Sequence, residues 1–235
     1  MIRLDIAGRI FFALIAASIS LISTQLAAQS LDQLSGRDAT AGLKAALNRG
    51  AEVAVASLGR TDGFWANPQV KIPLPEHLQR ARTALYFLGK RDEVNALELA
   101  VNRAAEQAVP QAKALLTNAV KSISVDDAKR ILRGGDDSVT QFFKAKTAAE
   151  LADRFLPIVR KVTDRSGLAQ EYNALAGQAA AFGLIKPEQA TVERYVTQKA
   201  LDGLYTMIAE EEKKIRANPV AAGSDIIRRV FGALN

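Results

Sequence analysis

The fold is decided by residues 187–218, PEQATVERYVTQKALDGLYTMIAEEEKKIRAN. Apolar residues recur there every three to four positions, the spacing that places them on one face of an α-helix. On a helical wheel they fill one broad arc, which consists of Ala200, Leu201, Leu204, Met207, Ile208 and Ile215. The stretch therefore predicts a long amphipathic helix that packs within a helical bundle.

Glu211 is the anomaly of this helix, because its position falls in the middle of the apolar arc. A charged carboxylate in such surroundings is costly unless it finds a cation, accepts several hydrogen bonds or takes up a proton. Two interpretations follow. Glu211 forms a buried ion pair with an arginine of a neighbouring helix, or it is a ligand-binding or acid/base carboxylate that lines a cleft.

A second long helix is predicted over about residues 92–123, with two charged residues off its apolar face. Arg103 and Glu106 lie opposite the main stripe, which consists of Val94, Leu97, Val101, Ala104 and Ala108. If neighbouring helices cover both faces, Arg103 is interior and can bind Glu211 through two hydrogen bonds. If they do not, Arg103 and Glu106 are both solvated.

Capping residues, prolines and glycines delimit the other helices. Three pairs have the spacing of an N-terminal capping box: Ser35 with Asp38, Ser124 with Asp127, and Thr147 with Glu150. Other ends or kinks are marked by Gly59 as a left-handed cap, Pro75, Gly89, Pro110, Pro157, Gly167 and Gly183. A helix is thus expected to start at Thr147. The pattern predicts an all-α, multi-helix bundle of about eight or nine helices.

One stretch, residues 60–74, departs from the helical pattern. Asp62-Gly63 is typical of a turn, and Val70-Lys71-Ile72 alternates as a strand does. A short hairpin is therefore an alternative to a plain loop here. Phe64 and Trp65 are predicted to pack on the bundle, and the alternative is that they form a platform for a ligand.

Residues 1–28 have the three parts of a secretory signal peptide. Arg3 and Arg9 form a positive start, an apolar run follows from Ile10 to Ile22, and small residues end at Ala28. Cleavage after Ala28 would leave residues 29–235 as a single helical domain exported to the periplasm. The alternative is that the segment remains as an uncleaved membrane anchor.

The composition excludes several kinds of site. The chain has no cysteine, which excludes disulfides and a thiol nucleophile. Its net charge of +6 is spread along the chain, and no stretch interleaves basic and aromatic residues, so nucleic acid is not a predicted partner. The only histidine is His77, and the acidic pairs lack the spacing of a metal site. No metal, cofactor or catalytic residue is predicted.

Several short stretches, spread over residues 42–231, together resemble a known family. They are Gly42-Leu43-Lys44, Asp62-Gly63-Phe64, Ile72-Pro73-Leu74-Pro75, Asn102-Arg103-Ala104-Ala105-Glu106, Gly134-Gly135-Asp136-Asp137, Lys199-Ala200-Leu201-Asp202-Gly203-Leu204 and Glu211-Glu212-Lys213. In combination they resemble an uncharacterised family of exported bacterial proteins, domain of unknown function 4197. The resemblance implies export and a helical domain, and it supplies no catalytic residues.

The resemblance also implies that six polar residues belong to one shared arrangement, which is the candidate binding centre. These are Asn102, Arg103, Glu106, Asp202, Glu211 and Arg216. It remains a hypothesis about geometry, because the family brings no established activity with it.

Two functions from different classes follow from these observations. The first is a non-enzymatic envelope protein that binds a lipid, an anionic envelope component or another envelope protein. It predicts an apolar groove between helices, with one or two charged groups at the mouth. The second is a carboxylate-dependent hydrolase that uses Glu211, and it predicts two carboxylates facing one pocket. A purely structural protein would have no large cleft.

Overall fold

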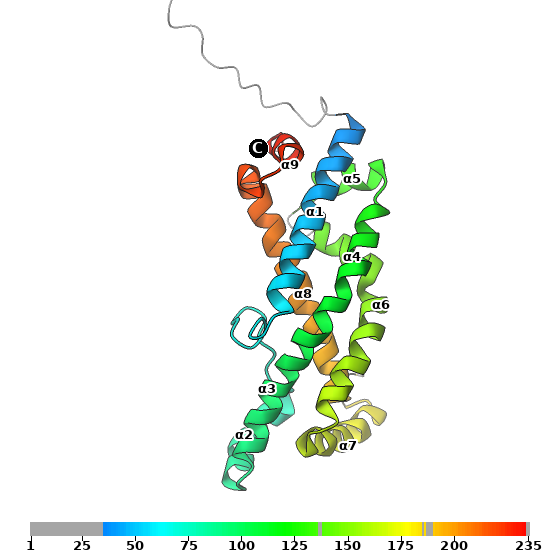
Figure 1. The fold of residues 1–235 in the computed structure, drawn as a ribbon. Coiled ribbons are helices and arrows are strands. Elements are labelled where there is room, and N and C mark those ends of the chain that lie inside the picture. Colours follow the sequence, from blue (N-terminus) through cyan, green and yellow to red (C-terminus); the bar gives the residue numbers. More distant parts are fainter. Residues whose placement is uncertain (1–34, 136–137, 185, 187–189, 234–235) are drawn as a thin grey trace, which may run out of the picture.

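The computed structural model describes residues 35–135, 138–184, 186 and 190–233. These residues form a bundle of α-helices without a strand, which confirms the predicted all-α class (Figure 1). The helices are α1 (Gly36–Leu58), α2 (Glu76–Phe87), α3 (Arg91–Ala108), α4 (Ala112–Lys121), α5 (Val125–Arg133), α6 (Ser138–Thr163), α7 (Gly167–Ala181), α8 (Val192–Ala217) and α9 (Asp225–Gly232). Two 3-10 turns, η3 (Val109–Gln111) and η5 (Pro219–Ala222), connect α3 to α4 and α8 to α9.

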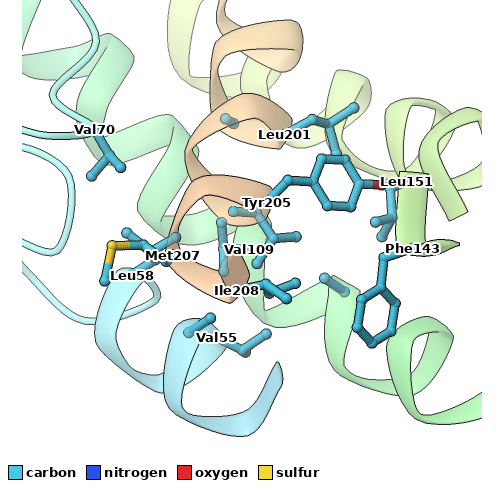
Figure 2. Close-up of a cluster of buried hydrophobic side chains, with 14 of the residues drawn as sticks. Val55, Leu58, Val70, Val109, Phe143, Leu151, Leu201, Tyr205, Met207 and Ile208 are labelled. Atoms are coloured by element: carbon cyan, nitrogen blue, oxygen red, sulfur yellow. The ribbon is translucent and has the colours of Figure 1, made fainter. Parts of the chain in front are cut away.

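Helix α8, the stretch that decides the fold, lies at the centre of the bundle. It packs against α6 on one side and α1 on the other, and α3 also packs on α6. In Figure 2, Tyr205 of α8 points toward Leu151 of α6, whereas Met207 lies near Leu58 of α1. Helices α5 and α9 lie at one end of the bundle, and α2 and α7 lie at the other (Figure 1).

Several helix ends form as their capping residues predict. The Ser35 hydroxyl accepts a hydrogen bond from the Asp38 N–H, and Ser124 with Asp127 forms a reciprocal capping box. After α2 and α7 the chain turns through Gly89 and Gly183, both with positive φ. A residue without a side chain adopts that conformation without strain, so glycine ends these two helices.

Two local predictions are wrong. Gly59 has a φ of −78° and is therefore not a left-handed cap. No helix begins at Thr147, because α6 runs from Ser138 to Thr163, with Pro157 inside it. The Thr147 hydroxyl is buried and bonds the Phe143 carbonyl and the Tyr205 hydroxyl, so it is not available as a cap. A capping pair in sequence therefore does not start a helix when the threonine faces the core.

Residues 60–74 form a series of turns and an extended segment, so the hairpin alternative is wrong. The alternation that suggested a strand is real, because Val70 and Ile72 are buried and Lys71 is exposed. What pairs with the Ile72 backbone is a side chain, Asn102 of α3, rather than a second strand.

The buried apolar side chains form one cluster that extends from Ala39 to Phe231. In the part of the chain that the structure describes, no helix is both long enough and apolar enough to cross a membrane. The predicted signal peptide, residues 1–28, lies outside the described residues.

Candidate functional site

Glu106 of α3 is a buried carboxylate that binds the loop of residues 60–74. Its side chain is 5% exposed, and its Oε1 accepts hydrogen bonds from the backbone N–H groups of Phe64 and Trp65, each at 3.1 Å. Its Oε2 is 2.7 Å from Nη1 of Arg103. One cation and two backbone donors therefore compensate for the burial of this charge.

Arg103 links Glu106 to the start of the loop. Its Nη2 lies 2.7 Å from Oδ1 of Asp62, and the hydrogen bonds to Glu106 and Asp62 raise the pKa of the guanidinium. Asp62 has a φ of 66°, and a Cβ on Gly63 would approach the Leu58 carbonyl oxygen to 2.4 Å. The Asp62-Gly63 turn is thus confirmed, and only glycine fits at its second position.

Asn102 completes the arrangement from the next position of α3. It is fully buried, its Oδ1 accepts from the Ile72 N–H at 2.8 Å, and its Nδ2 donates to the Ile72 carbonyl at 2.8 Å. Asn102, Arg103 and Glu106, together with Asp62, are called the loop clamp below. Each of the three α3 residues binds the loop, so the arrangement fastens the loop to α3.

The two aromatic residues of the loop have different positions. Phe64 is fully buried and packs on α8, where a Cβ on Gly203 would come within 2.7 Å of its ring. Trp65 is partly exposed, and the Lys71 ammonium lies 3.8 Å from its ring centroid. Phe64 is therefore a plug in the core, as predicted, and Trp65 packs under a lysine of its own loop.

Glu211 is partly buried, less deeply than its neighbour Glu212, and its ion-pair partner is not the predicted arginine. Its side chain is 16% exposed and forms an ion pair with Lys214 at 2.6 Å, whereas that of Glu212 is 3% exposed and forms one with Arg216 at 2.8 Å. The predicted Arg103–Glu211 pair is not formed. The buried acid of this segment is the neighbouring residue, because α6 and α9 cover the side of α8 that bears Glu212.

The six residues of the predicted binding centre therefore lie in different places. Asn102, Arg103 and Glu106 are brought together in the loop clamp. Arg216 binds Glu212 and the Ile131 carbonyl of α5, near the opposite end of α8 from the loop. Asp202 accepts a hydrogen bond from Gln198 on the exposed side of α8. From the loop contact at Gly203 to Arg216 is about 20 Å along the helix, so one ligand-sized centre does not contain all six.

Glu193, a third buried carboxylate, escaped the sequence analysis because it lies in the first turn of α8. Its Oε1 accepts from the Thr163 hydroxyl at 2.8 Å, and its Oε2 accepts from Nδ2 of Asn173 at 2.9 Å. Asn173 in turn accepts from the Val192 N–H. These bonds fasten α7 to the start of α8, where the helix dipole also favours a carboxylate.

Helices α2 and α7 lie at the end of the bundle that is far from α9 (Figure 1). Both helices pack on α3, and the space between them holds a groove of about 480 Å³. Leucine and alanine side chains dominate its lining: Leu78, Ala81, Leu85, Leu168, Leu175, Ala176, Ala179 and Leu184. Its size is in the range of small-molecule binding sites in proteins.

Of the residues that the structure describes, three with polar or ionisable side chains also line the groove: His77, Glu171 and Tyr172. His77 and Glu171 are exposed, so both lie at the surface. Both carboxylate oxygens of Glu171 are 2.9 Å from the Lys90 ammonium, which raises the pKa of Lys90. Tyr172 is buried, and the loss of hydration raises the pKa of its phenol. The groove thus has an apolar interior with charge at the mouth.

The sequence contained a signal for this groove. Residues 167–181 include a single charged residue, Glu171, and apolar residues on every side of the helix. Such a helix is expected to be buried all round. In the structure Leu175 of this helix is 71% exposed, and α2 buries only Leu78. The sequence therefore predicts that α7 has more apolar surface than one neighbour can cover. It does not predict that α2 is the helix on the other side of the groove.

Among the described residues, no group of three or more His, Cys, Asp or Glu side chains is placed to hold a metal ion. Comparisons with curated proteins and with solved structures give no match for the chain. A family model does match, over residues 33–232, and its description is "Protein of unknown function (DUF4197)". Because that match covers most of the chain, the protein belongs to this family of unknown function.

Proposed function

We propose that the protein is a non-catalytic binding protein of the bacterial envelope, and that its ligand is an amphiphile with an acyl chain. The α2–α7 groove is the observation that supports the proposal. It is a concave, mostly apolar site of about 480 Å³ with His77 and Glu171 at its rim. An acyl chain matches such an interior, since burying each CH₂ group is worth about 0.8 kcal/mol.

The polar end of the ligand would remain at the mouth of the groove. Lys90 and His77 offer hydrogen-bond donors there, and Lys90 already binds one carboxylate, that of Glu171. A carboxylate or phosphate head group is therefore the anchor that suits this mouth. The envelope location rests on the signal-peptide pattern of residues 1–28, and an envelope supplies acyl amphiphiles in quantity.

The proposal is tested by titrating the chain that starts at Gln29 with a fluorescent fatty-acid analogue below its critical micelle concentration. The core cluster begins at Ala39, so this chain keeps all of it. Ala81→Trp places an indole in the groove and is expected to weaken binding at least about tenfold, because the ligand and the indole compete for one volume.

Ala84→Trp is the matched control, since Ala84 is an exposed residue of the same helix that does not line the groove. It is expected to bind the probe as the unaltered chain does. Equal binding by both variants, or no binding by the unaltered chain, would contradict the proposal. A thermal melt of each variant verifies that α2 is still folded.

The second function, a hydrolase that uses Glu211, stays a prediction of the sequence. Glu211 is bound to Lys214, and the cavity beside its neighbour Glu212 holds about 10 Å³, room for one water at most. Among the residues that the structure describes, one carboxylate lines the α2–α7 groove, that of Glu171, whereas such a hydrolase requires two. We therefore favour binding over catalysis.

A further inference from the structure

Exposed apolar side chains are concentrated around the α2–α7 groove. Among the described residues, six large apolar side chains are more than half exposed, and five of them belong to α2, α7 or the turns that follow. The five are Phe87, Leu88, Leu175, Phe182 and Leu184, and the sixth is Val220 near α9. Isolated exposed apolar residues are ordinary, but a concentration of this kind marks a surface that binds something.

The C-terminal ends of α2 and α7, which flank the groove, share one feature: exposed large apolar residues next to a glycine with positive φ. Phe87 and Leu88 precede Gly89, whose φ is 77°, and Phe182 and Leu184 surround Gly183, whose φ is 71°. Phe87 is 88% exposed and Phe182 is 81% exposed, so neither aromatic ring contributes to the core. Each turn thus presents a large apolar tip to the outside.

Each tip is followed, within two residues of its turn, by a Lys or Arg residue. Lys90 and Arg91 come after Gly89, and Lys186 comes two residues after Leu184; Arg91 and Lys186 are exposed. Three of the cations near the groove are already paired with acids: Arg80 with Glu76, Arg82 with Glu98 and Lys90 with Glu171. Arg91, which lies over the Tyr86 ring, and Lys186 are the exposed cations beside the two tips. Apolar tips next to cations are the chemistry that binds an anionic lipid surface.

From this placement we infer that the two tips dock the protein on the surface of an anionic bilayer, with Phe87, Leu88, Phe182 and Leu184 inserted among the lipids. The groove between α2 and α7 then opens at the membrane, so an acyl chain passes between bilayer and protein without crossing water. In that respect the inference rests on the proposed function and adds the partner that supplies its ligand.

Flotation of the chain that starts at Gln29 with vesicles tests the inference. We expect binding to vesicles that contain phosphatidylglycerol, weak binding to vesicles of phosphatidylcholine, and release by high salt. The double variant Phe87→Ser, Leu88→Ser is expected to bind anionic vesicles at least about tenfold more weakly, and Arg91→Gln about fivefold more weakly. Val220→Ser, which alters an exposed apolar residue elsewhere, should change nothing.

Undiminished vesicle binding by the double variant would overturn the inference. So would a dimer of the unaltered chain that the double variant loses, since the tips would then bind a second copy. The soluble fatty-acid probe separates this failure from that of the proposed function. If the unaltered chain binds the probe but does not bind anionic vesicles, only the docking fails. If the unaltered chain binds anionic vesicles but not the probe, only the proposed function fails.

Discussion

The loop clamp and the α2–α7 groove differ in which side chains are buried: polar side chains are buried in the loop clamp, whereas apolar side chains are exposed around the groove. In the loop clamp, Asn102 and Glu106 are buried and bind backbone groups of residues 60–74, so hydrogen bonds from buried side chains hold the loop. At the groove, Leu175 and Phe87 are apolar and exposed, and neither is covered. The comparison teaches that the polar residues of the loop clamp serve the fold, whereas the apolar surface that the fold leaves uncovered is where we propose that a ligand binds.

The largest expected effect comes from breaking the loop clamp. Glu106→Ala removes the acceptor for the Phe64 and Trp65 N–H groups and leaves Arg103 without its buried partner. Loss of one partner of a buried pair costs about 3 to 5 kcal/mol in the free energy of unfolding. Denaturant titration measures this cost.

The control for this variant is Glu150→Ala, which removes an exposed ion pair with Arg154 on α6. Exposed pairs contribute about 1 kcal/mol or less. If the two variants lost equal stability, the loop clamp would not be the structural device described here.

A smaller effect separates two neighbouring acids. Glu212→Ala is expected to lower the free energy of unfolding by about 2 to 3 kcal/mol, because Arg216 loses a buried partner. Glu211→Ala should lower it by less than about 1 kcal/mol, since its partner Lys214 is exposed. Thermal and denaturant unfolding of both variants measure the difference. The reverse order would restore Glu211 as the interior acid.

The smallest effect concerns alkaline pH. Burial, assisted by the charge of Tyr172, raises the pKa of Tyr195 from 10.0 to about 12. A phenol whose pKa is higher in the folded state stabilises the fold below pH 10, and this contribution is lost as the pH rises through about 12. Stability is therefore expected to fall over that window, and less steeply in Tyr195→Phe. A fall that is identical in both proteins would refute the assignment to this residue.

How much of the fold was predictable depends on whether the signal is local. Ser35 with Asp38, and Ser124 with Asp127, cap helices because their hydrogen bonds involve residues three positions apart. Thr147 has the same spacing with Glu150 but lies inside α6, where the Tyr205 hydroxyl of a distant helix binds it. The residues around Thr147 do not indicate that partner, because Tyr205 lies 58 positions later in the sequence.

The candidate site shows the same limit. An ideal wheel places Glu211 in the apolar arc, yet in the structure it lies beside Gly50 of α1, which has no side chain to cover it. Glu212, one position later, faces Val139 of α6 and Phe231 of α9. Which of two adjacent acids is buried is thus decided by the neighbouring helices. The loop clamp was partly foreseen, because its three α3 residues were candidates, but their partner proved to be the loop and not Glu211.

The most direct test of the central claim, that the ligand binds the α2–α7 groove, uses a fatty acid with a nitroxide on its chain. Methyl resonances of the chain that starts at Gln29 are recorded with and without this molecule. The groove account predicts broadening of Leu78, Leu85 and Leu175. It predicts none at Leu43 of α1, because the preceding residue, Gly42, packs against α9 at the opposite end of the bundle. Broadening at Leu43, or at none of these leucines, would contradict it.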